Sequence, residues 1–151
     1  MSKKKRYVPD GLNCEKLRKQ ALELSVLARH EAAILQQLPA TFAATLVVHM
    51  KRLDISKDKL AETSLLSAKS IQNFRTGRNT KATLNSVLAL CIGLGLTPLL
   101  SEDLLYKSGY VLKNTPCEIF YRQLLNICYN CTIHECNAVL LICGFDILIA
   151  E

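Results

Sequence analysis

Two short helical patterns separated by only three residues limit most strongly what this chain can fold into. Each pattern follows a serine, Ser56 or Ser67, and serine in that position is a typical helix N-cap. Gly77 stands where a glycine commonly ends a helix in a left-handed conformation. The chain is therefore expected to form two short helices joined by a tight turn at residues 64–66. The expected helices are 57–63 and 68–75.

The apolar residues of this pair fall on one side of each expected helix. Leu60 and Ala61 face inward on the first, and the small Ala61 lets the second helix cross closely over it. Ile71 and Phe74 face inward on the second. At about 100° per residue, the opposite side of the second helix is polar. The residues expected there are Lys69, Asn73 and Thr76, with Gln72 beside them.

Positive charge is concentrated in the same region. The chain has a net charge of +6, and no acidic residue occurs between Glu62 and Glu102. Lys, Asn and Gln side chains can bond base edges in the major groove, and cations pair with phosphates. Charge and spacing together favour a DNA-binding helix pair over the alternative, a solvated helical hairpin. The cations between the two glutamates are Lys69, Arg75, Arg78 and Lys81.

The same stretch resembles the helix-turn-helix of the lambda-repressor-like (XRE) family. The matching residues are Ser56, Leu60-Ala61-Glu62, Leu66-Ser67, Ser70-Ile71, Phe74, Gly77 and Arg78. The resemblance implies an all-α fold with a five-helix bundle over roughly 41–109, whose second short helix enters the major groove of double-stranded DNA. It also implies a sequence-specific transcriptional regulator, with repression as the expected mode of action.

The expected DNA contacts form two sets. By position in the family pattern, base edges are contacted by Ala68, Lys69 and Asn73, and the polar side of the helix adds Gln72 and Thr76. Phosphates are contacted by Lys57, Ser67, Arg78 and Asn79 by position, and the capping and charge pattern adds Ser56 and Lys81.

The chain departs from the family pattern at two places. Leu65 stands where the family usually has glycine, and a leucine held in a left-handed conformation would cost roughly 1–2 kcal/mol. Arg75 stands where the family commonly has glutamate, which adds a cation near the phosphates.

Further helices are expected on both sides of this pair. We expect three parts: a basic arm and long helix (1–38), a DNA-binding domain (39–110) and a C-terminal helical hairpin (111–151) that packs on the same core or forms a dimer interface. The last helix, after Thr132, is apolar almost all round, which indicates burial in a core or in a subunit interface. The chain is expected to act as a homodimer, because one short helix buries too little surface for tight specific binding.

In the helix expected over 116–130, the apolar side is Ile119, Phe120, Leu124, Ile127 and Cys128.

Other classes of function find less support. Neither a secretory signal nor a membrane span is recognised, so reduced thiols, a cytoplasmic location and no membrane partner are expected. The three histidines have no acidic partner at a suggestive spacing, so neither an enzyme nor a cofactor is expected. A protein-interaction or antitoxin-like module without strong DNA binding remains the alternative. The spacing of Cys128, Cys131, His134 and Cys136 matches no common zinc module, and no metal is expected there.

Overall fold

The computed structural model describes residues 11–78 and 81–150, and the chain divides into two compact units, 1–37 and 38–151. The described residues form eight α-helices and no strand, which confirms the predicted all-α class. None of these helices combines the length and the apolar character that crossing a membrane requires. The basic arm predicted at Lys3–Arg6 lies outside the described residues.

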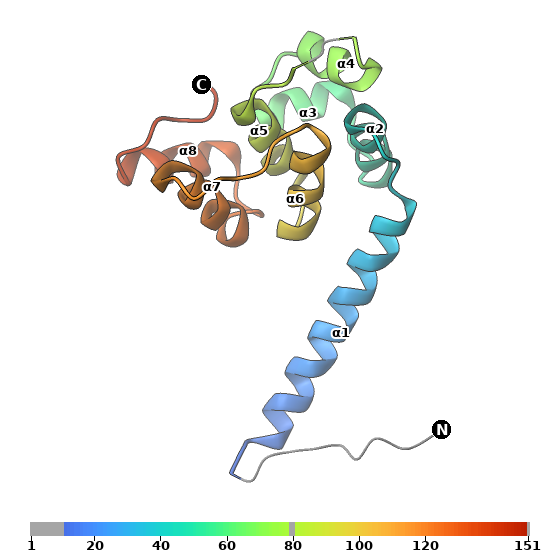
Figure 1. Ribbon diagram of the computed structural model, residues 1–151, viewed down its shortest axis with the longest axis vertical. Helices are drawn as coiled ribbons and strands as arrows, with labels where there is room; N and C mark the ends of the chain where they lie inside the picture. Colours follow the sequence, from blue (N-terminus) through green and yellow to red (C-terminus); the bar gives the residue numbers. More distant parts are fainter. Residues whose placement is uncertain (1–10, 79–80, 151) are drawn as a thin grey trace. The chain divides into compact units, whose positions relative to one another are not determined.

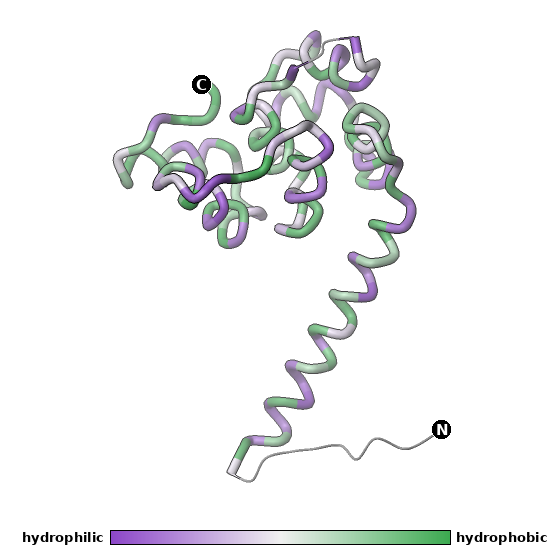
Figure 2. The backbone as a smooth tube through the Cα atoms, viewed as in Figure 1, coloured by the Kyte–Doolittle hydropathy of each residue, from purple (hydrophilic) through white to green (hydrophobic). Residues whose placement is uncertain are grey.

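The first unit consists of helix α1, Cys14–Gln37. Asn13 begins it as predicted, because its side-chain oxygen accepts a hydrogen bond from the backbone N–H of Lys16 at 3.1 Å. Figure 2 shows hydrophobic and hydrophilic residues interspersed along the whole helix. Several of its apolar side chains face solvent, such as Leu22, which is 67% exposed.

Seven helices form the second unit, in which α3 contacts both α4 and α5. Helix α2 contacts α4 and α6, and α5 contacts α6. The hairpin of α7 and α8 joins this group through contacts of α7 with α6 and of α8 with α5. Figure 1 shows this hairpin at one end of the unit and α4 at the other. The helices are α2 (Phe42–Arg52), α3 (Lys57–Ser64), α4 (Ala68–Thr76), α5 (Leu84–Leu94), α6 (Pro98–Lys107), α7 (Pro116–Ile127) and α8 (Ile133–Ile142).

Most of these helices begin at a Ser or Thr side chain. At each such N-cap the hydroxyl oxygen accepts a hydrogen bond from the backbone N–H three residues later, which satisfies one donor that the first turn leaves free. Helix α6 begins differently, with Pro98 in its first turn. The capping residues are Thr41, Ser56, Ser67, Thr83, Thr115 and Thr132.

Helix α5 supplies the centre of the core, with a continuous buried run from Val87 to Ile92. Fully buried leucines of other helices complete the core, including Leu46 of α2 and Leu60 of α3, the helix that contacts α5. Burying one such side chain contributes about 1.5–3 kcal/mol. The core therefore fixes α3 and α4 against the rest of the unit.

The apolar side predicted for α7 is only partly correct, because Leu124 is buried as predicted but its flanking isoleucines are not. Ile127 is 74% exposed and Ile119 is also exposed, whereas Tyr121 and Leu125 are buried with Leu124. The helix also ends at Ile127 and not at residue 130, because Cys128 leaves the helical conformation.

Helix α8 is buried along one side only. Ile133, Cys136 and Leu140 face the core, whereas Leu141 and Ile142 are exposed to solvent. An apolar residue that is 83% exposed, as Ile142 is, does not contribute to the core of this unit.

Candidate nucleic-acid interface

The turn between α3 and α4 is tight and is held by one side chain. The Ser64 hydroxyl donates to the carbonyl oxygen of Leu60 at 2.6 Å and accepts from the backbone N–H of Leu66 at 3.3 Å. Between them Leu65 adopts φ 62° and ψ 11°, the left-handed conformation. The position where the resembled family has glycine thus does require that conformation, and the leucine occupies it under strain.

Helix α4 is fixed by its inner side. Ile71 is fully buried, and Phe74 is buried against Phe42 of α2, with the two ring centroids 6.1 Å apart in an edge-on arrangement. These contacts set which residues of α4 face outward.

The outer side of α4 carries the residues predicted to read bases. Lys69, Gln72 and Thr76 are exposed, and Ala68 and Asn73 are half-buried beside them. The Thr76 hydroxyl already donates to the carbonyl oxygens of Gln72 and Asn73, at 3.0 and 3.3 Å. Thr76 is therefore left with acceptor capacity only, whereas the side chains of Lys69 and Gln72 form no hydrogen bond with the other described residues.

The two N-cap hydroxyls differ in what they can still bind. Ser67 donates its hydroxyl hydrogen to the Ser70 hydroxyl at 2.8 Å and accepts from the Ser70 N–H. Ser56 accepts from the Lys59 N–H at 3.1 Å. A phosphate at the start of α4 would thus bind backbone N–H groups, whereas at α3 the Ser56 hydroxyl can add a donor.

The predicted phosphate contacts lie at both ends of the helix pair. Lys57 is half-buried at the first position of α3, and Arg78 and Lys81 are exposed after α4. Asn79 lies outside the described residues. The segment after Lys81 is anchored, because the Tyr110 hydroxyl donates to the carbonyl oxygen of Ala82 at 2.8 Å.

Cations in this region are largely free of carboxylates. On α3 and α4 the structure pairs Lys59 with Glu62 at 3.4 Å, both exposed. Within the described ranges, Lys57, Lys69 and Arg78 form no ion pair. These charges remain available to a polyanion.

Sequence reasoning missed Lys51 at the end of α2. Its side chain lines the same hollow as Ser56 and Lys57 at the start of α3 and Arg75 at the end of α4. Its position in the last turn of a helix, where cations are favoured, was the available signal. Only the fold shows that this turn lies beside the start of α3.

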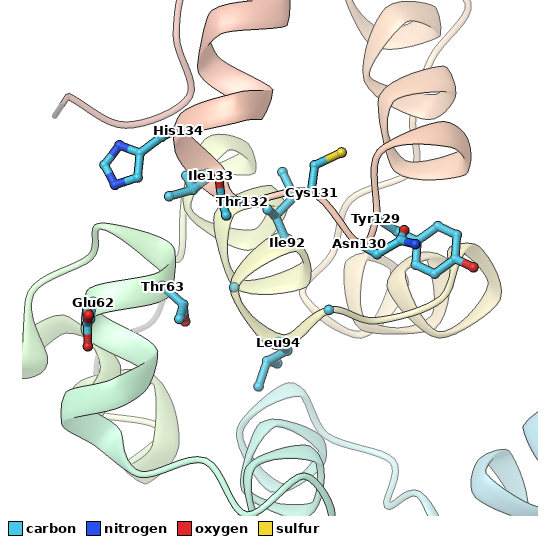
Figure 3. A pocket seen from close by; sticks show the side chains of 12 residues that line it. Glu62, Thr63, Ile92, Leu94, Tyr129, Asn130, Cys131, Thr132, Ile133 and His134 are labelled. Atoms are coloured by element: carbon cyan, nitrogen blue, oxygen red, sulfur yellow. The ribbon is translucent and has the colours of Figure 1, made fainter.

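A second hollow, of about 400 Å³, lies beside α3 and is lined by two of the four cysteine and histidine residues considered above, Cys131 and His134. Figure 3 shows Thr63 of α3, Ile92 of α5 and the segment 129–134 around it, with the Cys131 side chain directed away from His134. Among the described residues, no three His, Cys, Asp or Glu side chains are arranged to hold a metal ion.

His49 is buried between α2 and α6. Burial, followed by the positive charge of Arg52, lowers the pKa of His49 from its usual 6.5 to about 4. The Arg52 guanidinium donates to Nδ1 at 3.1 Å, so the neutral ring carries its proton on Nε2. This Nε2 is buried without an acceptor in the described part of the chain. His49 is therefore a neutral core residue at pH 7.

Comparisons of the chain with protein-family models, curated proteins and solved structures gave no match. Function is therefore inferred from the geometry and the charge of α3 and α4.

Proposed function

We propose that the protein is a sequence-specific, DNA-binding transcriptional regulator that acts in the cytoplasm, with repression as its mode. In this proposal α2–α6 form a lambda-repressor-like bundle, and α4 enters the major groove while α3 lies across the backbone. The protein performs no catalysis in this role and needs no cofactor.

One observation carries the proposal: α4 buries Ile71 and Phe74 on one side and leaves the polar side around Lys69 and Gln72 exposed. The major groove is about 12 Å wide and admits one helix, whose free polar edge meets the bases. In the proposal Lys69 donates to guanine O6 and N7, while Gln72 and the half-buried Asn73 pair with adenine.

The phosphate contacts fix the orientation of α4 in the groove. Lys57 and the Ser56 cap bind one strand at the start of α3, and Arg78 and Lys81 bind beyond the end of α4. Contacts of this kind supply affinity without sequence preference, so they account for binding to any duplex.

A homodimer is part of the proposal, because two half-sites give the contact area that one short helix lacks. Two apolar surfaces are available to a second copy: the exposed residues of α1, such as Leu22 and Leu24, and Leu141 with Ile142 on α8.

The decisive experiment is selection of bound sequences from random duplex DNA by the full chain. We expect an enriched, near-palindromic site whose half-sites are one helical turn apart or a multiple of it. A Lys69→Ala/Gln72→Ala variant is expected to lose the enrichment, whereas Lys59→Ala, on the exposed side of α3, keeps it. Absence of any duplex binding at low salt would contradict the proposal.

The alternative function is a protein-interaction module on the same scaffold. The observation that favours it is the exposed apolar pair Leu141 and Ile142, together with a hollow beside α3. Salt separates the two functions, because DNA binding weakens steeply with rising salt in proportion to the phosphates contacted. A module of this kind shows no DNA shift at low salt.

A further inference from the structure

A hollow of about 310 Å³ at the start of α3 is lined by cationic side chains from three helices. It is lined by Lys51 from the last turn of α2, Lys57 from the first turn of α3 and Arg75 from the last turn of α4. Asp54 is the one acidic residue in its lining. Three positive side chains therefore share the hollow with a single carboxylate.

The guanidinium of Arg75 lacks a partner inside this arrangement. Its Nε is buried, and no described atom accepts a hydrogen bond from it. A buried, charged donor without an acceptor is costly, and buried polar groups in folded proteins are normally satisfied. An anion in the hollow would place a negative charge beside this guanidinium, which lines the hollow.

The other cations of the hollow are also without a counter-ion. Within the described residues, neither Lys51 nor Lys57 forms an ion pair, and the pairs Lys59–Glu62 and Lys107–Asp103 do not touch the hollow. The carboxylate of Asp54 lies beyond ion-pair distance of all three cations. Among the described residues, the lining of the hollow therefore keeps a net positive charge.

The start of α3 adds oriented backbone donors at the same place. The Ser56 hydroxyl oxygen accepts a hydrogen bond from the N–H of Lys59, whereas the N–H groups of Lys57 and Asp58 have no acceptor within the helix. Backbone N–H groups at a helix start, combined with a guanidinium and two ammonium groups, match the chemistry of a phosphate oxyanion.

We propose that this hollow binds one phosphate group, held by Lys51, Lys57 and Arg75. Binding of a phosphate group here does not depend on the proposed function. Only the source of that phosphate, the DNA backbone, rests on the proposed function. Lys51 and Arg75 join the DNA contacts on the side where α3 begins, and α2 takes part in binding through its last turn.

The first test measures duplex affinity against salt concentration, with a random-sequence duplex and the full chain. We expect Lys51→Gln/Arg75→Gln to reduce the slope of log affinity against log salt by about 0.9, the value for one lost phosphate on B-DNA. The control Lys59→Gln removes an exposed cation of α3 outside the hollow and leaves the slope unchanged. If the double variant does not fold, the single variant Lys51→Gln is measured instead, because Lys51 is exposed and its replacement leaves the core intact.

The second test uses inorganic phosphate as the probe. We expect the Nε–H resonance of Arg75 to shift saturably as phosphate is added, at matched ionic strength in sodium chloride, and Lys51→Gln to weaken that binding. A shift with phosphate but a wild-type salt slope in the variants would make a free anion the occupant and overturn the DNA source.

No shift with phosphate and no change of slope would overturn the site altogether. If the wild-type chain binds no duplex, the proposed function fails, and the phosphate titration alone decides on the hollow.

Discussion

Gly93 of α5 lies directly against the backbone of Ser64 at the end of α3. A β-carbon at position 93 would stand 3.0 Å from the Ser64 β-carbon and 3.1 Å from its backbone nitrogen. The two helices therefore approach closely where the turn leading to α4 begins, and this approach leaves no room for a side chain at Gly93.

Gly93→Ala is expected to lower the free energy of unfolding by about 1 kcal/mol. Overpacking costs about 1–3 kcal/mol, and the better helix propensity of alanine returns roughly 1 kcal/mol of this. Urea denaturation of the full chain measures the change. Asn85→Ala, in the first turn of the same helix, adds no atom and serves as the control, and an alanine variant at least as stable as the wild type would contradict the close contact.

Leu65→Gly and Leu65→Ala separate backbone strain from side-chain packing. Both variants remove the leucine side chain, but only glycine adopts φ 62° without a steric penalty. We expect the glycine variant to be more stable than the alanine variant by about 1 kcal/mol in denaturant unfolding. Equal stabilities would show that the turn stores no strain at this position.

Lys69→Ala is expected to weaken binding to the selected site by about 1–3 kcal/mol and to relax one base position. The reason is the loss of a donor that reaches a base edge from the exposed side of α4. Competition binding against single-base variants of the site measures both effects. An unchanged base preference would remove Lys69 from the residues that read the sequence.

Arg78→Ala is expected to weaken binding to all sequences alike and to reduce the salt slope by about 1, because one phosphate contact is lost. Lys113→Ala, an exposed cation between α6 and α7, is the control. A loss confined to one base position would instead place Arg78 at a base edge.

His49 makes the stability depend on pH. Its pKa is about 4 in the folded protein and 6.5 when exposed, so the unfolded chain binds more protons between these values. The contribution of His49 to stability is complete above about pH 6.5 and is lost as the pH falls towards 4. We expect His49→Asn to have a flatter profile of unfolding free energy over this range.

The control for His49 is His30→Asn, on the exposed surface of α1, with the wild-type pH profile as its expected result. Arg52, Asp103 and Lys107 also act on the ring of His49, so the comparison uses variants that leave these three residues in place. Parallel profiles for wild type and His49→Asn would contradict the burial of a neutral imidazole.

The sequence was sufficient to predict where most helices begin, because a cap is a local interaction. The hydroxyls of Ser56 and Ser67 each bind a backbone N–H three residues away, and Gly77 ends α4 in the left-handed conformation. The outward direction of Lys69 followed from the burial of Ile71 by helical geometry alone.

The sequence was not sufficient where the outcome depends on which surface a helix meets. Helix α7 has two apolar sides, and in the folded unit Tyr121 and Leu125 are buried while Ile127 stays exposed. Its end was missed because the turn, closed by the N–H of Cys131 bonding to the carbonyl of Cys128, contains neither glycine nor proline. Lys51 was missed because it reaches the start of α3 only through the packing of α2.

The phenol of Tyr110 reaches back across 28 residues to the carbonyl of Ala82, the residue that follows Lys81. This hydrogen bond connects the backbone just before α5 to the segment that follows α6. A charged side chain on a tethered backbone has less conformational freedom to lose when it meets its target. Under the proposed function, the restrained backbone beside Lys81 lowers the entropy cost of placing this cation at a phosphate.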